Sequence, residues 1–164
     1  MTPSPPADRP APGGWDARPC RDVRRRRAAA FDGPLLGVVA LGGALGAGAR
    51  YAVALALPTA PGAFPWATLW TNVAGCALMG VFTALLDEAR RPHRLLRPLV
   101  GTGVLGGFTT FSTYALETRA LLERGQVPTA FGYLAGTLVA ALSAVAVAAW
   151  ATRSLAARAR RRRA

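Results

Sequence analysis

The hydrophobic positions of this chain fall into four long runs separated by short polar or proline-containing segments. The runs cover about residues 35–57, 66–86, 99–122 and 128–150. A helix rises about 1.5 Å per residue, so about 20 apolar residues cross a hydrocarbon core about 30 Å thick. Because a bilayer core offers no water to the backbone, each crossing segment must pair its N–H and C=O groups internally. The pattern predicts an all-α membrane protein with four transmembrane helices.

The connections between the runs are short and place their prolines at the helix edges. They cover residues 58–65, 87–98 and 123–127. A proline at an edge starts or ends a helix without interrupting one. These edge prolines are Pro58, Pro61, Pro65, Pro92, Pro98 and Pro128.

Charge divides the chain into three parts. The 164 residues carry a net charge of +12, although 52% of them are hydrophobic. Residues 1–30 hold +4 and residues 153–164 hold +6, so residues 31–152 hold only +2. We expect a disordered, Pro-rich basic tail over 1–30, a transmembrane domain over 31–152 and an Arg-rich tail over 153–164. A soluble nucleic-acid-binding domain would carry its basic residues on the folded surface, so nucleic acid is not an expected partner.

The basic residues also predict an orientation. With four spans, both termini and the loop 87–98 lie on one side of the membrane. Arginine clusters gather on the cytoplasmic side of membrane proteins, which predicts a multi-pass plasma-membrane protein with cytoplasmic N- and C-termini. Arg24–Arg27 before an apolar run is also typical of a signal peptide, but this run exceeds 20 residues and three more follow. The clusters are Arg24–Arg27, Arg90, Arg91, Arg94, Arg97, Arg153, Arg158 and Arg160–Arg163.

The residue types needed for catalysis or zinc binding are scarce. One His and two Cys are too few for a structural zinc site of the usual ligand count. The chain has no Ser/His/acid set, no paired carboxylates within the apolar runs and no phosphate-binding loop. We therefore expect no enzymatic activity.

The third run has an unusual composition for a membrane helix. Gly106 and Gly107 lower helix propensity, and four hydroxyl side chains follow within six residues. The third helix is therefore expected to break at the Gly-Gly-Phe-Thr-Thr segment. Freed carbonyls there would suit a cation, and freed N–H groups and hydroxyls an anion. A close-packed interface of small residues explains the same composition, and both interpretations stay open.

Other polar residues inside the runs each allow two interpretations. Asn72 can hydrogen-bond a neighbouring helix or donate to an anion. Arg50 can reach the membrane surface or raise the anion concentration at a pore mouth. Tyr133 and Thr137 share a helix face. Their hydroxyls can form a polar track along that face or hydrogen-bond to the backbone of their own helix. Small residues of the first run predict close helix packing; they are Gly42, Gly43, Gly46 and Gly48.

Three segments resemble the Fluc/CrcB-type fluoride channels of bacteria. They are GGALGAGARY (42–51), TLWTNVAGCALMG (68–80) and GGFTTFSTY (106–114), and the resemblance covers about residues 35–150. It implies a fluoride-selective channel that exports fluoride passively and lowers its cytoplasmic toxicity. It also implies four-span subunits that form antiparallel dimers with two pores.

The resemblance also implies site residues. A structural Na⁺ at the dimer centre would be held by the backbone carbonyls of Gly106 and Thr109. The two pore phenylalanines of the family match Phe111 and Tyr114, so this chain departs from the pattern at the second. Arg50 matches an arginine that follows the first run's glycines. The implied fluoride path comprises Asn72, Thr110, Phe111, Ser112, Thr113, Tyr114, Tyr133 and Thr137.

The charge bias bears on the implied dimer. An antiparallel homodimer needs one sequence inserted in both orientations, a dual topology that calls for a weak bias. The bias here is strong. We therefore expect insertion in one orientation and a heterodimer with an oppositely oriented paralogue; a homodimer is the alternative.

Two other functions compete with the channel. A small four-span, dual-topology multidrug exporter needs a membrane-embedded carboxylate in its first span, and residues 35–57 contain none. A non-transporting membrane anchor could use its basic tails on anionic lipid or nucleic acid. That function leaves Asn72 and residues 106–114 unexplained.

Overall fold

The computed structural model describes residues 33–89 and 93–162, and its regular elements there are all helical. The tail predicted over residues 1–30, with Arg24–Arg27, lies outside the described residues, as do Arg90, Arg91 and Arg163. Three helices are long and apolar enough to cross a membrane: α2 (Gly33–Ala56), α3 (Trp66–Glu88) and α6 (Val127–Arg161). They match the first, second and fourth predicted runs.

The third predicted run is divided into shorter pieces. It begins with the π-helix η1 (Arg97–Leu105), whose wider turns follow Pro98, and continues through α4 (Gly106–Phe108). Thr109 then has extended backbone, with φ −73° and ψ 156°, and helical turns resume with α5 (Ser112–Glu123). That these pieces together cross a bilayer stays a prediction.

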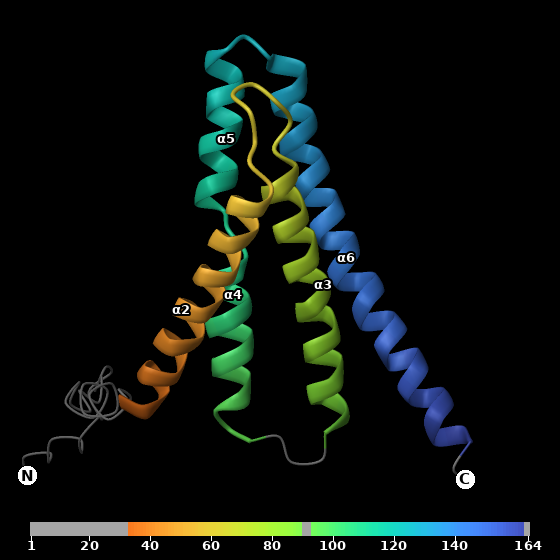
Figure 1. Cartoon of the computed structure of the whole chain (residues 1–164). Helices are drawn as coiled ribbons and strands as arrows, with labels where there is room; N and C mark the ends of the chain where they lie inside the picture. The colour runs from red at the N-terminus through yellow and green to blue at the C-terminus, as the bar shows by residue number, and fades with distance from the viewer. Residues whose placement is uncertain (1–32, 90–92, 163–164) are drawn as a thin grey trace, which may run out of the picture. The chain divides into compact units, whose positions relative to one another are not determined.

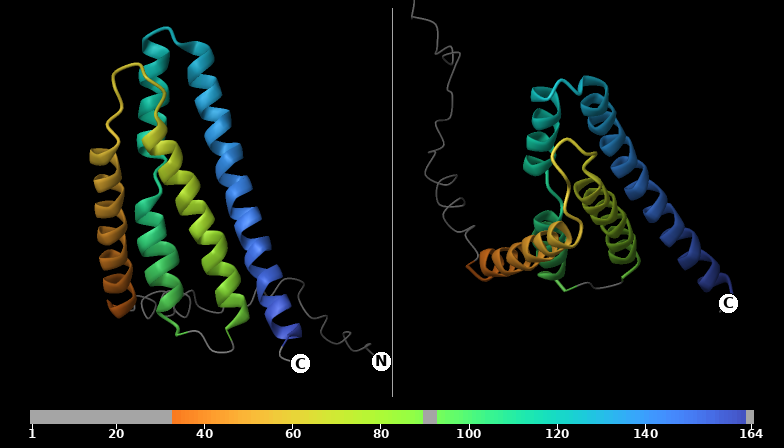
Figure 2. Two further views of the ribbon diagram at one scale, coloured as in Figure 1. Left: turned by 45° about the vertical axis from the view of Figure 1, so that its right-hand side comes forward. Right: turned by 45° about the horizontal axis from the view of Figure 1, so that its top comes forward.

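We call η1, α4 and α5, with the non-helical residues 109–111 between α4 and α5, the interrupted segment, and residues 109–111 the interruption. The helices of residues 33–162 pack in two groups that share the interrupted segment. α3 runs beside α6, while α2 packs on η1 and α4 (Figures 1 and 2). α5 packs on α6 near the turn that joins them. The end of α3, the start of η1 and the end of α6 lie together, opposite that turn (Figure 1).

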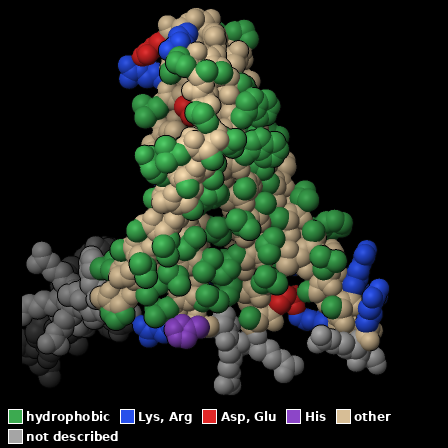
Figure 3. Space-filling model, viewed as in Figure 1, with side chains coloured by type: hydrophobic (Ala, Val, Ile, Leu, Met, Phe, Trp, Pro, Cys, Tyr) green, Lys and Arg blue, Asp and Glu red, His purple; other side chains and the backbone are tan. Residues whose placement is uncertain are grey.

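Most large hydrophobic side chains face outward. The buried cluster is small and consists of Tyr114, Leu121, Ala130 and Tyr133. By contrast, Leu45 is 59% exposed and Trp70 55%, and apolar side chains cover much of the visible surface (Figure 3). A water-soluble protein rarely exposes contiguous apolar surface on this scale. The arrangement is that of a multi-pass membrane protein.

Glycines bring α2 and η1 into backbone contact. A Cβ at Gly42 would lie 2.5 Å from the Leu99 carbonyl oxygen, and one at Gly46 would overlap the carbonyl oxygen of Val104. Gly107 likewise lies against the backbone of Gly43. The predicted close packing therefore holds for three of the four glycines. It is wrong for Gly48, which is exposed and where an added Cβ would meet nothing within 4 Å, because this residue points away from η1.

We expect Gly46→Ala to destabilise the protein and Gly48→Ala to leave it as stable or more stable. The first adds a Cβ where backbone already lies, at a cost of about 1–3 kcal/mol. The second removes only the conformational freedom of glycine in the unfolded chain, which raises the free energy of unfolding by about 0.5–1 kcal/mol. Thermal unfolding of both purified variants in detergent, followed by tryptophan fluorescence, measures the difference. Equal midpoints would contradict the packing.

Candidate functional site

Asn72 holds the non-helical backbone that follows α4. Its Nδ2 donates to the Thr110 carbonyl at 3.0 Å, and its Oδ1 accepts from the Thr110 N–H at 2.8 Å. Asn72 is only 9% exposed, so both bonds form away from water. Of its two predicted roles, the interhelical bond is therefore present. One amide N–H remains, and no described residue accepts it.

Two carbonyls at the interruption lose their usual helical donors. The N–H of Thr110, which would bond to Gly106 in a continuous helix, donates to Asn72 instead. The N–H of Thr113, which would bond to Thr109, donates to Thr110 Oγ1 at 3.2 Å and so caps the start of α5. No described residue donates to either the Gly106 or the Thr109 carbonyl. These are the two carbonyls that the family resemblance implies for a structural Na⁺.

Arg50 reaches the interruption from α2. Its Nε donates to the Gly107 carbonyl at 3.3 Å. The side chain therefore satisfies a carbonyl at the end of α4 and does not simply extend to the membrane surface. Its guanidinium places positive charge beside the interrupted backbone.

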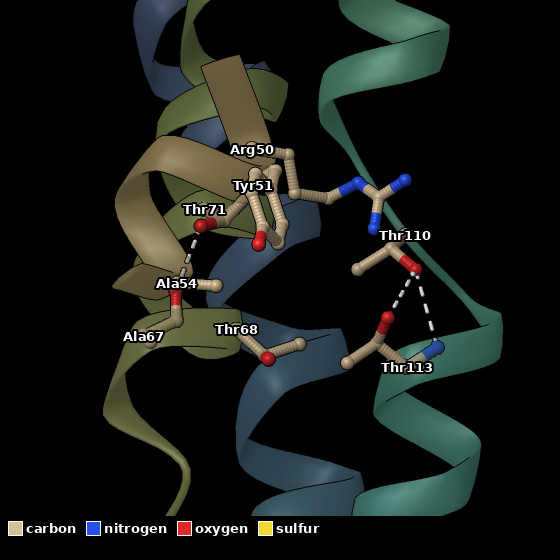
Figure 4. Close-up of a pocket in the computed structure, with 8 residues that line it drawn as sticks. All are labelled: Arg50, Tyr51, Ala54, Ala67, Thr68, Thr71, Thr110 and Thr113. Atoms are coloured by element: carbon tan, nitrogen blue, oxygen red, sulfur yellow. Dashed lines mark hydrogen bonds between the residues drawn. The ribbon is translucent and has the colours of Figure 1, made fainter. Parts of the chain in front are cut away.

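A small cavity opens next to Arg50. Its volume is about 110 Å³, and threonine hydroxyls from α3 and from the interrupted segment line it (Figure 4). Thr110 Oγ1 donates to Thr113 Oγ1 at 3.1 Å, whereas the Thr71 hydroxyl turns back to the Ala67 carbonyl at 2.8 Å. Ser112 is exposed, with its Oγ 3.4 Å from Thr110 Oγ1. The lining threonines are Thr68, Thr71, Thr110 and Thr113.

A larger groove lies between the interrupted segment, α3 and α6. Asn72, Thr110, Phe111 and Thr137 all line it. The Thr137 hydroxyl is buried, with the residue only 4% exposed, yet it has no hydrogen-bond partner among the described residues. Phe111 is 77% exposed. The residues that line this mostly apolar groove therefore include a threonine whose buried hydroxyl is unused, an asparagine with one unused amide N–H, and an exposed aromatic ring.

Aromatic rings form a row that starts at this groove, which Phe111 and Tyr114 line. The ring centroids of Phe111 and Tyr114 are 5.8 Å apart, and those of Tyr114 and Tyr133 are 5.2 Å apart. The Tyr114 hydroxyl donates to the Leu134 carbonyl at 2.5 Å. Because the hydroxyl proton is donated to α6, Tyr114 lines the groove with its ring and has no free O–H to donate there.

Glu117 forms a contact that the sequence analysis did not predict. Its carboxylate accepts from the Thr68 hydroxyl at 2.9 Å and from the Tyr133 hydroxyl at 2.7 Å. Tyr133 therefore bonds across helices and not to its own, contrary to one of the two interpretations above. The available signal was that Glu117 is the only acid within residues 99–122. Its partners were not predictable, because they come from two other helices.

The structure thus places most of the predicted residues close to one another around the interruption. Arg50, Asn72 and Thr110 meet there, and Phe111 and Thr137 share the groove. Tyr133 lies behind Tyr114 and is fully buried. Ser112 lines neither cavity.

Comparisons with known proteins give the family. Residues 37–149 match the model of a family described as CrcB-like protein, Camphor Resistance (CrcB). The chain is 54% identical over 143 residues to "Fluoride-specific ion channel FluC 1" of Streptomyces coelicolor, covering 87% of this chain and 90% of that relative. This alignment is longer than the family match, so the similarity extends beyond residues 37–149.

Two further relatives have the same level of identity. "Fluoride-specific ion channel FluC 2" of Nocardia farcinica is 54% identical over 126 residues, 74% of this chain and 90% of the relative. The protein of the same name from Streptomyces avermitilis is 54% identical over 116 residues, 71% of this chain and 73% of the relative. The chain belongs to the CrcB family.

Proposed function

We propose that this protein is a fluoride-selective channel that exports fluoride passively and lowers its cytoplasmic toxicity. The observation that carries the proposal is the groove beside the interrupted segment. Its buried Thr137 hydroxyl has no partner among the described residues and lies in the same lining as the free N–H of Asn72. The names of the relatives agree with this chemistry.

The groove suits a small anion that holds its water strongly. A filter for such an ion must replace water with hydrogen-bond donors, and neutral donors do so without trapping it. Thr137 and Asn72 supply an O–H and an N–H, and the edge of the Phe111 ring carries partial positive charge. No step requires a chemical reaction, so the proposed channel is not an enzyme.

Arg50 contributes the electrostatic component of this function. It lines the small cavity, and Thr110 lines both that cavity and the groove. Positive charge at a narrow entrance raises the local anion concentration. Arg50 therefore concentrates fluoride beside the donors but does not bind it in the groove.

The same proposal includes the fourth span and the dimer. η1, α4 and α5 together would form the third of four crossings, because they connect two apolar helices that are each long enough to span the membrane. An antiparallel copy would cover the open side of the groove, where Phe111 and Leu138 are 77% and 58% exposed. Non-helical backbone at membrane depth would then be enclosed by protein.

The Gly106 and Thr109 carbonyls fit a structural Na⁺ at the centre of that dimer. Both have lost their helical donors and receive no other hydrogen bond from the described residues. Carbonyl oxygens of unwound segments are suitable Na⁺ ligands, and the antiparallel copy would supply a matching pair. The ion would add positive charge that stabilises the freed carbonyls.

Charge supports a heterodimer with an oppositely oriented paralogue. Ten of the twelve net positive charges lie in the two tails. Streptomyces avermitilis has two relatives with numbered names, FluC 2 and FluC 3, so one organism can hold more than one such protein. The termini would be cytoplasmic in every copy of this chain.

Reporter fusions at the two termini test this orientation. We expect both reporters to give the cytoplasmic signal, because the arginine clusters resist translocation. A near-equal split of orientations would instead support a dual-topology homodimer.

Ion flux from liposomes tests the function. The purified protein, alone or with an oppositely oriented paralogue, should release trapped fluoride and retain trapped chloride. A fluoride-selective electrode and a chloride electrode follow the two ions. Failure to release fluoride in both preparations would overturn the proposal, and equal release of both ions would refute the selectivity.

Substitutions at the groove test the site. Asn72→Ala should lower fluoride flux about tenfold or more, since each lost buried hydrogen bond costs about 1–3 kcal/mol. Phe111→Ile should lower flux by removing the ring edge while leaving an apolar side chain. Flux is measured on protein that elutes as an assembled species.

Thr83→Ala is the matched control for Asn72→Ala. Thr83 lies on the same helix, and its hydroxyl donates only within that helix, to Met79 at 2.8 Å and Gly80 at 3.1 Å. It should conduct as the unmodified channel does. The site assignment is wrong if Asn72→Ala and Phe111→Ile conduct as fast as this control.

A further inference from the structure

The end of α6 extends well beyond the apolar part of that helix. α6 has 35 residues and is therefore about 50 Å long, against a hydrocarbon core of about 30 Å. It continues without interruption past Trp150 into the arginine-rich segment that was predicted as a separate tail. Trp150 is 70% exposed, and exposed tryptophan is typical of the membrane–water boundary. If Trp150 marks the membrane boundary, the last eleven residues of α6 start there and extend the helix by about 16 Å beyond it.

One face of this extension is fixed to α3. Arg153 Nη2 lies 3.3 Å from Asp87 Oδ2, and Arg160 forms an ion pair with Glu88. The two arginines are seven residues apart, which is close to two helical turns, so they share a face. Asp87 also lies 4.0 Å from Arg97 at the start of η1. These pairs hold the extension against the ends of α3 and η1.

The other face carries arginines with no acidic partner. Arg158, Arg161 and Arg162 are exposed and form no ion pair with any described residue. At 100° per residue they occupy an arc of about 100° that turns away from Arg153 and Arg160. Leu155, which is 65% exposed, lies beside this arc. The unpaired arginines therefore sit next to apolar side chains that face the lipid.

The opposite end of the molecule lacks such a surface. There Arg119 pairs with Glu123 at 2.7 Å, which leaves Arg124 as the remaining arginine at that end of the described chain. Within the described residues, the unpaired basic face is thus confined to one membrane surface.

We propose that the outward arginines of the α6 extension, Arg158, Arg161 and Arg162, bind the phosphates of anionic phospholipids. A guanidinium donates two parallel N–H groups that match a phosphate, and it stays charged at every relevant pH. Trp150 and Leu155 hold the helix at the depth where those phosphates lie. The ion pairs to Asp87 and Glu88 keep the arginines turned toward lipid and away from the protein.

Lipid binding to the full-length protein tests this inference. Delipidated protein in detergent is titrated with phosphatidylglycerol or phosphatidylcholine, and native mass spectrometry counts the bound lipids. Each arginine at an anionic surface contributes about fivefold to binding. We therefore expect R158Q/R161Q/R162Q to weaken phosphatidylglycerol binding at least about tenfold and to leave phosphatidylcholine binding unchanged.

Two variants make the result specific. R24Q/R25Q/R26Q removes the same charge from the N-terminal tail and should weaken phosphatidylglycerol binding less than the α6 glutamine variant does. R158K/R161K/R162K keeps the charge but loses the paired N–H groups, so its binding should fall between that of the unmodified protein and that of the α6 glutamine variant. Circular dichroism checks that all variants keep their helix content. Equal losses in the α6 and N-terminal glutamine variants, or no loss in either, would overturn the proposal. Tighter binding of a short duplex DNA than of phosphatidylglycerol would also overturn it.

Discussion

The pair of hydrogen bonds between Asn72 and the Thr110 backbone is the constraint on which the rest of the site depends. An interrupted helix in a bilayer must satisfy the groups that it frees, because unpaired backbone in hydrocarbon costs several kcal/mol. Asn72 satisfies the N–H and C=O of one residue at once. That leaves the Gly106 and Thr109 carbonyls without a donor from the described residues and directs Thr110 Oγ1 to the start of α5. One buried amide thus determines which backbone groups at the interruption are paired within the described chain.

Arg50 and the glycines of α2 complete this arrangement from the other side. Gly42 and Gly46 let α2 approach η1 closely, and this approach brings Arg50 to the Gly107 carbonyl at 3.3 Å. The packing interpretation and the site interpretation of the glycine-rich segments are therefore not exclusive. Close backbone packing is what positions a charged side chain beside the interruption.

Hydrophobic patterning predicted the helices well because bilayer thickness dictates their length. The first two runs agree with α2 and α3 to within two residues. The end of α6 was not predicted by this pattern. The apolar residues end near Trp150, but the helix continues through an alanine- and arginine-rich sequence, whose residues also favour helix. Glycines and hydroxyls indicated where the third run changes, but they could not indicate that η1 is a π-helix.

The sequence pointed to residues that the structure brings close together, but it did not predict the contacts between them. The family resemblance pointed to Asn72, Phe111 and Thr137, and the structure places these in one groove. It suggested no partner for Glu117, whose two hydroxyl donors come from α3 and α6. Such contacts depend on how three helices pack, which local sequence does not encode.

The Tyr114 hydroxyl has a consequence for how the groove tolerates sequence change. Its acceptor is the main-chain carbonyl of Leu134 and not a side chain. Every amino acid presents the same carbonyl, so the side chain at 134 can vary without loss of this bond. The orientation of the ring is therefore tied to the path of the α6 backbone and not to the identity of residue 134.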